Sequence, residues 1–172
     1  MVYSLGRLSP SRFRVNQLQR PYDDIYIFRN LTHLEIHDFW ETAIPVLHLC
    51  PKLQNLKLCE QCFVENWDGE DDEESWGEPE YVPQCLLSCL TTYNILHFLG
   101  LQNELLLAEY ILRNAYNLQT TTIKCKREPL KIERKLSQCP KASATCQLSV
   151  CLKDTDYLMA NADFYIVLTV ND

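Results

Sequence analysis

Cysteine and histidine are the residues of this chain best suited to chemistry, because a thiolate or an imidazole can act as a nucleophile, a base or a metal ligand. The chain has nine cysteines and four histidines. Cys59 and Cys62 have the spacing of half a structural zinc site, which needs two further ligands. The other cysteines have irregular spacings, so we expect no metal site and no cofactor. The pairs weighed as the second half of such a site are Cys85/Cys89 and Cys139/Cys146.

A second group of polar side chains alternates along one short stretch. His33, Glu35 and His37 are two residues apart, and on a strand such residues share one face. An imidazole beside a carboxylate could mimic a metal-binding set. The same alternation describes any solvent-facing row of a strand, and this is the interpretation that we favour.

Signatures of catalysis are missing from the sequence. The four glycines build no phosphate-cradling loop, and no cysteine sits in a protease or redox signature. The acidic run lacks the regularly spaced oxygens of a calcium loop. The sequence therefore predicts a protein that is not an enzyme.

Charge is concentrated in one stretch. The chain has a net charge of -7, but residues 65–80 contain nine acids and no base, so the remainder sums to +2. We expect residues 64–80 to form a solvated acidic insertion loop. The nearly neutral remainder predicts no nucleic-acid partner, since phosphate binding requires a basic face.

The start of the chain bears on the cell compartment. Its first residues lack the continuous apolar core of a secretory leader, and no apolar run approaches the ~20 residues that span a bilayer. We therefore expect reduced cysteines, a cytoplasmic or nuclear location and no membrane partner. Residues 1–24 are interpreted as an N-terminal leader or an incomplete repeat.

Apolar positions recur along the chain. The stretches "LTHLEI" (31–36) and "LQNLKL" (53–58) match at three apolar positions, 22 residues apart, which is a spacing typical of leucine-rich repeats. Three later stretches continue the frame. The expected strands are 33–38, 55–60, 92–98, 120–125 and 146–151.

Segments with helical spacing separate these strands. Residues 41–50 allow one or two turns because Pro45 interrupts them. Residues 103–118 predict the strongest helix, with Asn103 as its N-cap, and residues 128–139 predict another, with Pro129 at its first position. Such units cannot bury their own apolar faces, so we predict an α/β fold, a short leucine-rich-repeat-like solenoid of strand–helix units that share one sheet. The apolar helix positions are Ala108, Ile111, Leu112, Ala115, Leu130, Ile132 and Leu136.

Three motifs resemble a known domain. They are "WGEPEYVPQCLLSCL" (76–90), "EYILRNAYNLQTTTI" (109–123) and "KLSQCPKASATCQLSV" (135–150). Together, over about residues 76–151, they resemble the FBD domain of plant proteins of the F-box, leucine-rich-repeat, FBD type. This resemblance implies a substrate-recognition role in a cullin-type ubiquitin ligase. We recognise no F-box here, so the ligase adaptor is not an expected partner.

The resemblance and the repeats suggest an organisation of the chain. We expect leucine-rich repeats over 25–63, the acidic loop over 64–80, an FBD domain over 81–152 that closes the solenoid, and an atypical C-terminal tail over 153–172. The stretch "FYIVLTV" within that tail has the composition of an edge strand.

The outward side chains of the expected strands would line an open face that a partner can reach. We therefore predict a non-catalytic protein-recognition module with an unknown protein target. The alternatives are a cysteine-based zinc-binding protein and a truncated remnant with no partner. The predicted partner-binding face consists of His33, Glu35, His37, Asn55, Lys57, Thr92, Asn94, Thr122, Lys124, Gln147 and Ser149.

Overall fold

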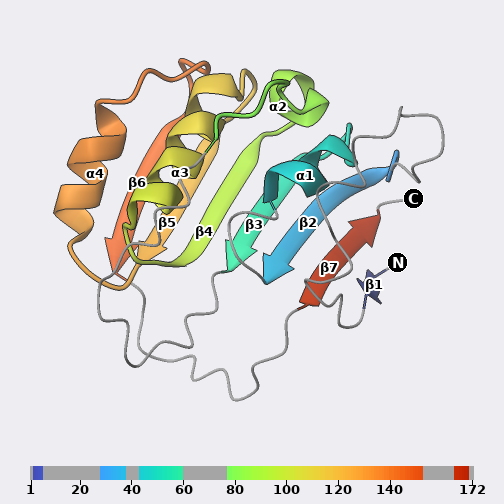
Figure 1. Ribbon diagram of the computed structural model, residues 1–172, viewed down its shortest axis with the longest axis horizontal. Helices are drawn as coiled ribbons and strands as arrows, with labels where there is room; N and C mark the ends of the chain where they lie inside the picture. Colours follow the sequence, from blue (N-terminus) through green and yellow to red (C-terminus); the bar gives the residue numbers. More distant parts are fainter. Residues whose placement is uncertain (1, 6–27, 38–42, 60–76, 153–164, 171–172) are drawn as a thin grey trace.

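The computed structural model describes residues 28–37, 43–59 and 77–152 with their side chains, and the backbone of residues 2–5 and 165–170. These residues form a mixed sheet of seven strands, with helices in a row along one face (Figure 1). The elements are β1 (Val2–Leu5), β2 (Leu31–His37), α1 (Ala43–His48), β3 (Asn55–Cys59), α2 (Gln84–Ser88), β4 (Thr92–Phe98), α3 (Gln102–Asn114), β5 (Thr120–Cys125), α4 (Pro129–Ser137), β6 (Gln147–Leu152) and β7 (Tyr165–Val170).

Strands β2 to β6 lie side by side in chain order, and each is parallel to its neighbours. One helix follows each of the first four, as expected for parallel strands that need a crossover connection. The five predicted strands are confirmed, with boundaries that agree within two residues. The α/β class is confirmed with them.

The two ends of the described chain extend the sheet beyond β2. Strand β7 pairs with β2 in the antiparallel direction, and β1 pairs with β7 (Figure 1). The strand expected in "FYIVLTV" therefore exists, but it is not the edge. Among the described residues, β1 and β6 are the outer strands.

The apolar positions of the parallel strands meet in one core. On β2 to β5, the inward residues of two register rows are at most 7% exposed, and the apolar ones among them belong to a single cluster. On β6, the inward Leu148 and Val150 are half-buried and pack against that cluster. The two register rows at the centre of the core are Leu34–Leu56–Tyr93–Thr121 and Ile36–Leu58–Ile95–Ile123. The leucines that repeat in the sequence are therefore neighbours in space.

Three of the helices lie where the sequence predicted them, but some details of the helices differ from the prediction. Helices α1, α3 and α4 lie within the predicted segments, apart from one extra residue at the start of α3, and Pro129 is the first residue of α4. Helix α2 was not predicted. Leu130 was wrongly placed on the apolar side of α4, since it is 76% exposed, whereas Ile132 and Leu136 are buried. Residues two apart on a helix do not share a face, so Leu130 could not join Ile132 in the core.

The start of α3 differs from the expectation. Its N-cap residue is Leu101 and not Asn103. The carboxylate of Glu104 accepts backbone N–H bonds from Leu99, Gly100 and Leu101, at 2.7 to 3.2 Å. This carboxylate takes over the capping role, because it satisfies backbone donors at and before the first turn.

Several predictions fall wholly or largely outside the described residues. These are the leader over 1–24, most of the acidic loop over 64–80, the position of Cys62 and most of the tail over 153–172. The domain boundaries stay predictions.

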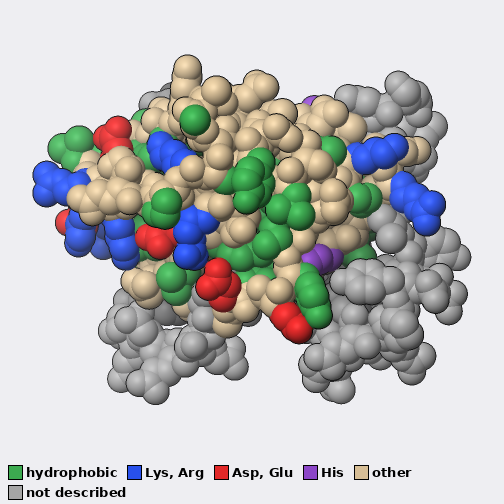
Figure 2. Space-filling view, turned by 90° about the horizontal axis from the view of Figure 1, so that it is seen from above, with side chains coloured by type: hydrophobic (Ala, Val, Ile, Leu, Met, Phe, Trp, Pro, Cys, Tyr) green, Lys and Arg blue, Asp and Glu red, His purple; other side chains and the backbone are tan. Residues whose placement is uncertain are grey.

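Basic side chains gather at one end of the molecule, near α4 (Figures 1 and 2). These basic residues lie on α4 and in the turn before it, and two acids, Glu128 and Glu133, lie among them. The exposed basic residues there are Lys126, Arg127, Lys131, Arg134 and Lys135. Where the structure describes the chain, no helix has the length and apolar character to cross a membrane.

Candidate functional site

The parallel strands place the predicted partner-binding residues in two rows on the face opposite the core side chains. Side chains alternate along a strand, so residues between the buried leucines point away from the core. One row is His33–Asn55–Thr92–Thr120–Gln147, and the next is Glu35–Lys57–Asn94–Thr122–Ser149. The structure thus brings the predicted residues together across five strands, and we call these two rows the open face.

Access to this region is uneven. Thr120, Gln147 and Ser149 are exposed, whereas the remaining members of the open face are half-buried. His37 is only 2% exposed and offers almost no area to a partner. Lys124 is half-buried and follows the second row on β5. The β5–β6 end of the open face is therefore the more accessible one.

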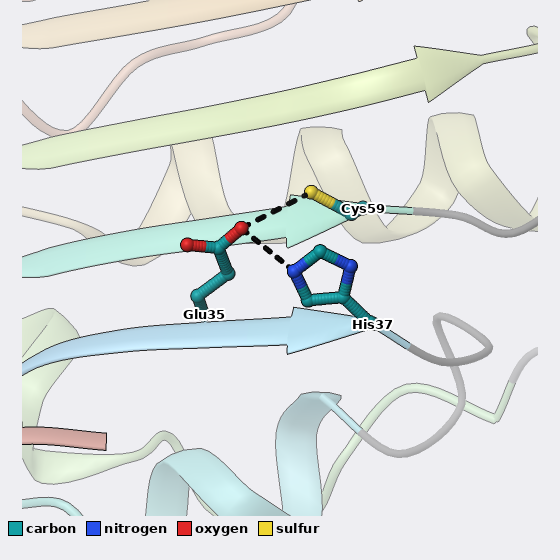
Figure 3. A group of neighbouring side chains, drawn as sticks. All are labelled: Glu35, His37 and Cys59. Carbon is teal, nitrogen blue, oxygen red and sulfur yellow. Dashed lines mark hydrogen bonds and ion pairs between the residues drawn. The ribbon is translucent and has the colours of Figure 1, made fainter. Parts of the chain in front are cut away.

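A cluster of polar groups lies at the β2–β3 end. Glu35 and His37 project from β2, and Cys59 projects from β3 (Figure 3). Lys57 also belongs to β3. The Oε1 atom of Glu35 lies 2.7 Å from His37 Nε2, 2.7 Å from Lys57 Nζ and 3.7 Å from Cys59 Sγ. We call Glu35, His37, Lys57 and Cys59 the Glu35 cluster.

Burial and pairing set the protonation of this cluster. Burial by itself raises the pKa of the Glu35 carboxyl, but hydrogen bonds from Lys57 and His37 outweigh it, so that pKa lies below its ordinary 4.5. Burial lowers the pKa of His37 below its ordinary 6.5, although the hydrogen bond to Glu35 opposes the shift. At neutral pH the cluster therefore holds a carboxylate beside a neutral imidazole.

His33 belongs to a different network. Its Nε2 accepts a hydrogen bond from Asn55 Nδ2 at 2.9 Å, and its Nδ1 lies 2.9 Å from Thr32 Oγ1. The metal-like set considered from the sequence, His33 with Glu35 and His37, is therefore not the set that converges. Cys59 takes the place of His33.

Comparison with known proteins identifies the family. Residues 78–123 match the FBD family model. An F-box/FBD/LRR-repeat protein of Arabidopsis thaliana is 34% identical over 151 residues, covering 79% of this chain and 33% of that protein. The chain belongs to the plant FBD family. A second F-box/FBD/LRR-repeat protein of Arabidopsis is 34% identical over 130 residues, with 70% of this chain and 29% of the relative covered.

A further Arabidopsis relative, an FBD-associated F-box protein, is 31% identical over 138 residues and covers 74% of this chain and 32% of itself. This FBD chain spans about one third of the length of these relatives. No solved structure matches it.

The FBD match covers only part of the open face. Residues 78–123 span α2, β4, α3 and the first residues of β5. They include Thr92, Asn94 and Thr122, whereas the Glu35 cluster precedes the match on β2 and β3. The FBD match and the Glu35 cluster are therefore separate features of one sheet.

Buried thiols of this FBD chain are poorly suited to nucleophilic chemistry. Burial raises the pKa of Cys85 and of Cys50 to about 12, so both stay protonated near neutral pH. Cys85 Sγ donates to the carbonyl of Leu47 at 3.7 Å, which ties α2 to α1. Both thiols act as small core side chains.

Sequence reasoning missed the meeting of Cys59 with Glu35 and His37. A signal for it exists in the 22-residue repeat, which pairs Ile36 with Leu58 and so brings His37 and Cys59 to the same level of the sheet. As a possible metal ligand, Cys59 had been considered only together with Cys62.

Proposed function

We propose that this chain is a non-catalytic protein-recognition module whose target binds the open face of a short leucine-rich-repeat-like solenoid. The observation that carries this proposal is the pair of polar rows that continue without a break across five parallel strands. A broad, shallow surface of mixed polar groups suits a protein partner, which is bound through many modest contacts.

Recurring hydrogen bonds support the solenoid. At the start of β3, β4, β5 and β6, a backbone N–H donates to the carbonyl of the residue just before the preceding parallel strand's first paired residue; the donor directly precedes its own strand in the first three bonds and is the first residue of β6 in the fourth. Gln54 donates to Thr32 at 2.9 Å, and Thr91 to Gln54, Gln119 to Thr91 and Gln147 to Gln119 at 2.8 Å each. A bond that recurs from one strand to the next supports the proposal that the strand–helix units stack as copies of one module.

The names of the relatives support the cellular role. They are F-box and FBD proteins, and in this proposal the chain recognises a protein destined for ubiquitination, in the cytoplasm or nucleus. Its contribution is selection of the target, with no chemical step of its own.

Proximity labelling in plant cells tests this function. The full chain is compared with a double variant on the accessible end of the open face, Thr122→Arg with Ser149→Arg. These two positions are register neighbours on β5 and β6. Proteins that the unaltered chain labels should no longer be labelled by this variant. Depletion of the chain should lengthen the lifetime of the same proteins.

A control variant on the helical side completes the test. Lys131→Ala with Glu133→Ala changes two exposed residues of α4 and should label the same proteins as the unaltered chain. Equal thermal unfolding temperatures establish that all three proteins are folded. Identical labelling by all three would contradict recognition through the open face.

A further inference from the structure

We propose that Glu35, His37 and Cys59 form a binding site for a divalent transition-metal ion, with zinc as the representative ion. This site lies outside the FBD match, and its Glu35 also belongs to the open face. Metal titration tests it without reference to target recognition. It differs from a pairing of Cys59 with Cys62, because its donors come from two neighbouring strands.

The donor types fit such an ion. A thiolate, an imidazole nitrogen and a carboxylate oxygen are the three kinds of protein ligand that zinc accepts. Here one of each type occurs, and the donor atoms all lie within 4.8 Å of one another. Figure 3 shows the three side chains directed toward a common point between β2 and β3.

The two separations measured from Glu35 Oε1 lie within about 0.6 Å of those in a tetrahedral centre. Zinc bonds of about 2.0–2.3 Å place two ligand atoms of a tetrahedron about 3.3–3.6 Å apart. Cys59 Sγ is 3.7 Å from Glu35 Oε1, close to that separation. His37 Nε2 and Glu35 Oε1 are 2.7 Å apart, so an ion between them widens this contact by roughly 0.6 Å. Rotation of the Glu35 side chain, which is 28% exposed, can widen this contact.

Binding of the ion is accompanied by the release of a proton. The donor forms that bind zinc are a neutral imidazole, a carboxylate and a thiolate. The Cys59 S–H bond breaks as the S–metal bond forms, and the proton passes to solvent. The His37 ring proton moves to Nδ1, which frees Nε2. One proton is therefore released for each ion bound.

Lys57 is the competitor for the same carboxylate. Its ammonium lies 2.7 Å from Glu35 Oε1 and acts as the counter-ion of the cluster. The Lys57 side chain is 39% exposed, so it can turn into solvent when an ion arrives. The site therefore predicts an unusual outcome, in which removing the positive charge of Lys57 strengthens metal binding.

Metal titration of the full chain tests this site. The protein is purified under reducing conditions, stripped with a chelator and titrated with Zn²⁺ against a chromophoric chelator, and with Co²⁺ by absorption spectroscopy. We expect one ion per chain at this site and a thiolate-to-cobalt charge-transfer band. Cys59→Ser and His37→Asn should each weaken Zn²⁺ binding by about 100-fold or more. Lys57→Met should tighten it by about two- to fivefold, the scale of a half-exposed ion pair.

Matched controls separate this site from adventitious thiol binding. Cys151→Ser removes an exposed cysteine of β6, and His33→Asn removes the histidine of the neighbouring network. Neither change should alter the affinity or the cobalt band. Loss of binding in Cys59→Ser and Cys62→Ser without loss in His37→Asn would overturn the proposal in favour of the local cysteine pair. Unchanged affinity in Lys57→Met would overturn it as well, and that variant keeps all three ligands even if His37→Asn fails to fold.

Discussion

Single residues decide the character of the β2–β3 end of the sheet. One oxygen of Glu35 meets an imidazole, an ammonium and a thiol, and these partners come from its own strand and from the next. The sequence predicted that Glu35 and His37 share a face, because the period of a strand is two. It did not predict their burial or the participation of Cys59. Those depend on the lateral register of β2 and β3, which alternation along one strand cannot supply.

Protonation of His37 should make stability depend on pH. Burial holds its pKa below the ordinary 6.5, and the pKa of Glu35 also lies below its ordinary 4.5, so the unfolded chain binds more protons than the folded one as the pH falls. The contribution of His37 is complete above about pH 6.5 and is lost as the pH falls through its folded pKa. Urea unfolding should therefore show lower stability at pH 5.5 than at pH 7.5. His37→Asn should reduce this difference.

A second histidine supplies the control for the pH experiment. Burial also lowers the pKa of His48, against an opposing hydrogen bond with the backbone of Tyr81. His48→Asn should remove its own part of the pH dependence and leave the part of His37. A fall in stability that is identical in the unaltered chain and in His37→Asn would contradict the assignment.

Tyr93 carries a buried hydroxyl with no hydrogen-bond partner among the described residues, and its side chain is 0% exposed. A buried polar group that makes no hydrogen bond lowers stability. Tyr93→Phe should therefore raise the free energy of unfolding, by about 1 kcal/mol in urea denaturation. Tyr116→Phe, at a residue that is 59% exposed, should leave it unchanged. A destabilised Tyr93→Phe would show that the hydroxyl has a partner in solution.

At the scale of elements, the periodic segments were predictable and the caps were not. The apolar pattern of α3 located the helix, since Ala108, Ile111 and Leu112 are all buried. Its start was assigned to Asn103 because short polar residues are common N-caps. The structure uses Glu104, whose carboxylate reaches back past Gly100, a residue with φ of +83°. Helix α2 has only five residues, too few for a helical period to show in the sequence.

Loss of the Glu104 carboxylate should loosen the turn between β4 and α3. Glu104 is 3% exposed and accepts bonds from three consecutive backbone N–H groups, which would lose their partner in Glu104→Ala. We expect a loss of about 2–4 kcal/mol in the free energy of unfolding. Glu133→Ala makes the same change at an exposed site of α4 and should shift that free energy by no more than about 0.5 kcal/mol. Equal effects of the two changes would argue against the capping role.

At the scale of the whole molecule, the pairing of the parallel strands could be predicted from the sequence, and the pairing of the antiparallel strands could not. The 22-residue spacing of two leucine motifs placed β2 beside β3, and the same frame located β4, β5 and β6. Strands β1 and β7 come from opposite ends of the chain and pair with each other. The local sequence of such a strand does not predict its pairing partner, because the pairing depends on which edge of the sheet is left free.

Because the strands share a single core, a cavity at one end of the sheet should also lower the stability of the strands at the other end. Leu56 on β3 is 0% exposed and lies in the same cluster as Ile123 on β5, two strands away. Leu56→Ala should lower the free energy of unfolding by about 2–5 kcal/mol, as a cavity in a packed core does. If the sheet unfolds as one unit, native-state hydrogen exchange should then lose protection in β5 by the same amount as in β3. Leu130→Ala, at a residue 76% exposed on α4, should change neither. Protection lost only in β2 to β4 would mean that the strand–helix units open separately, and the shared core would not be the source of their stability.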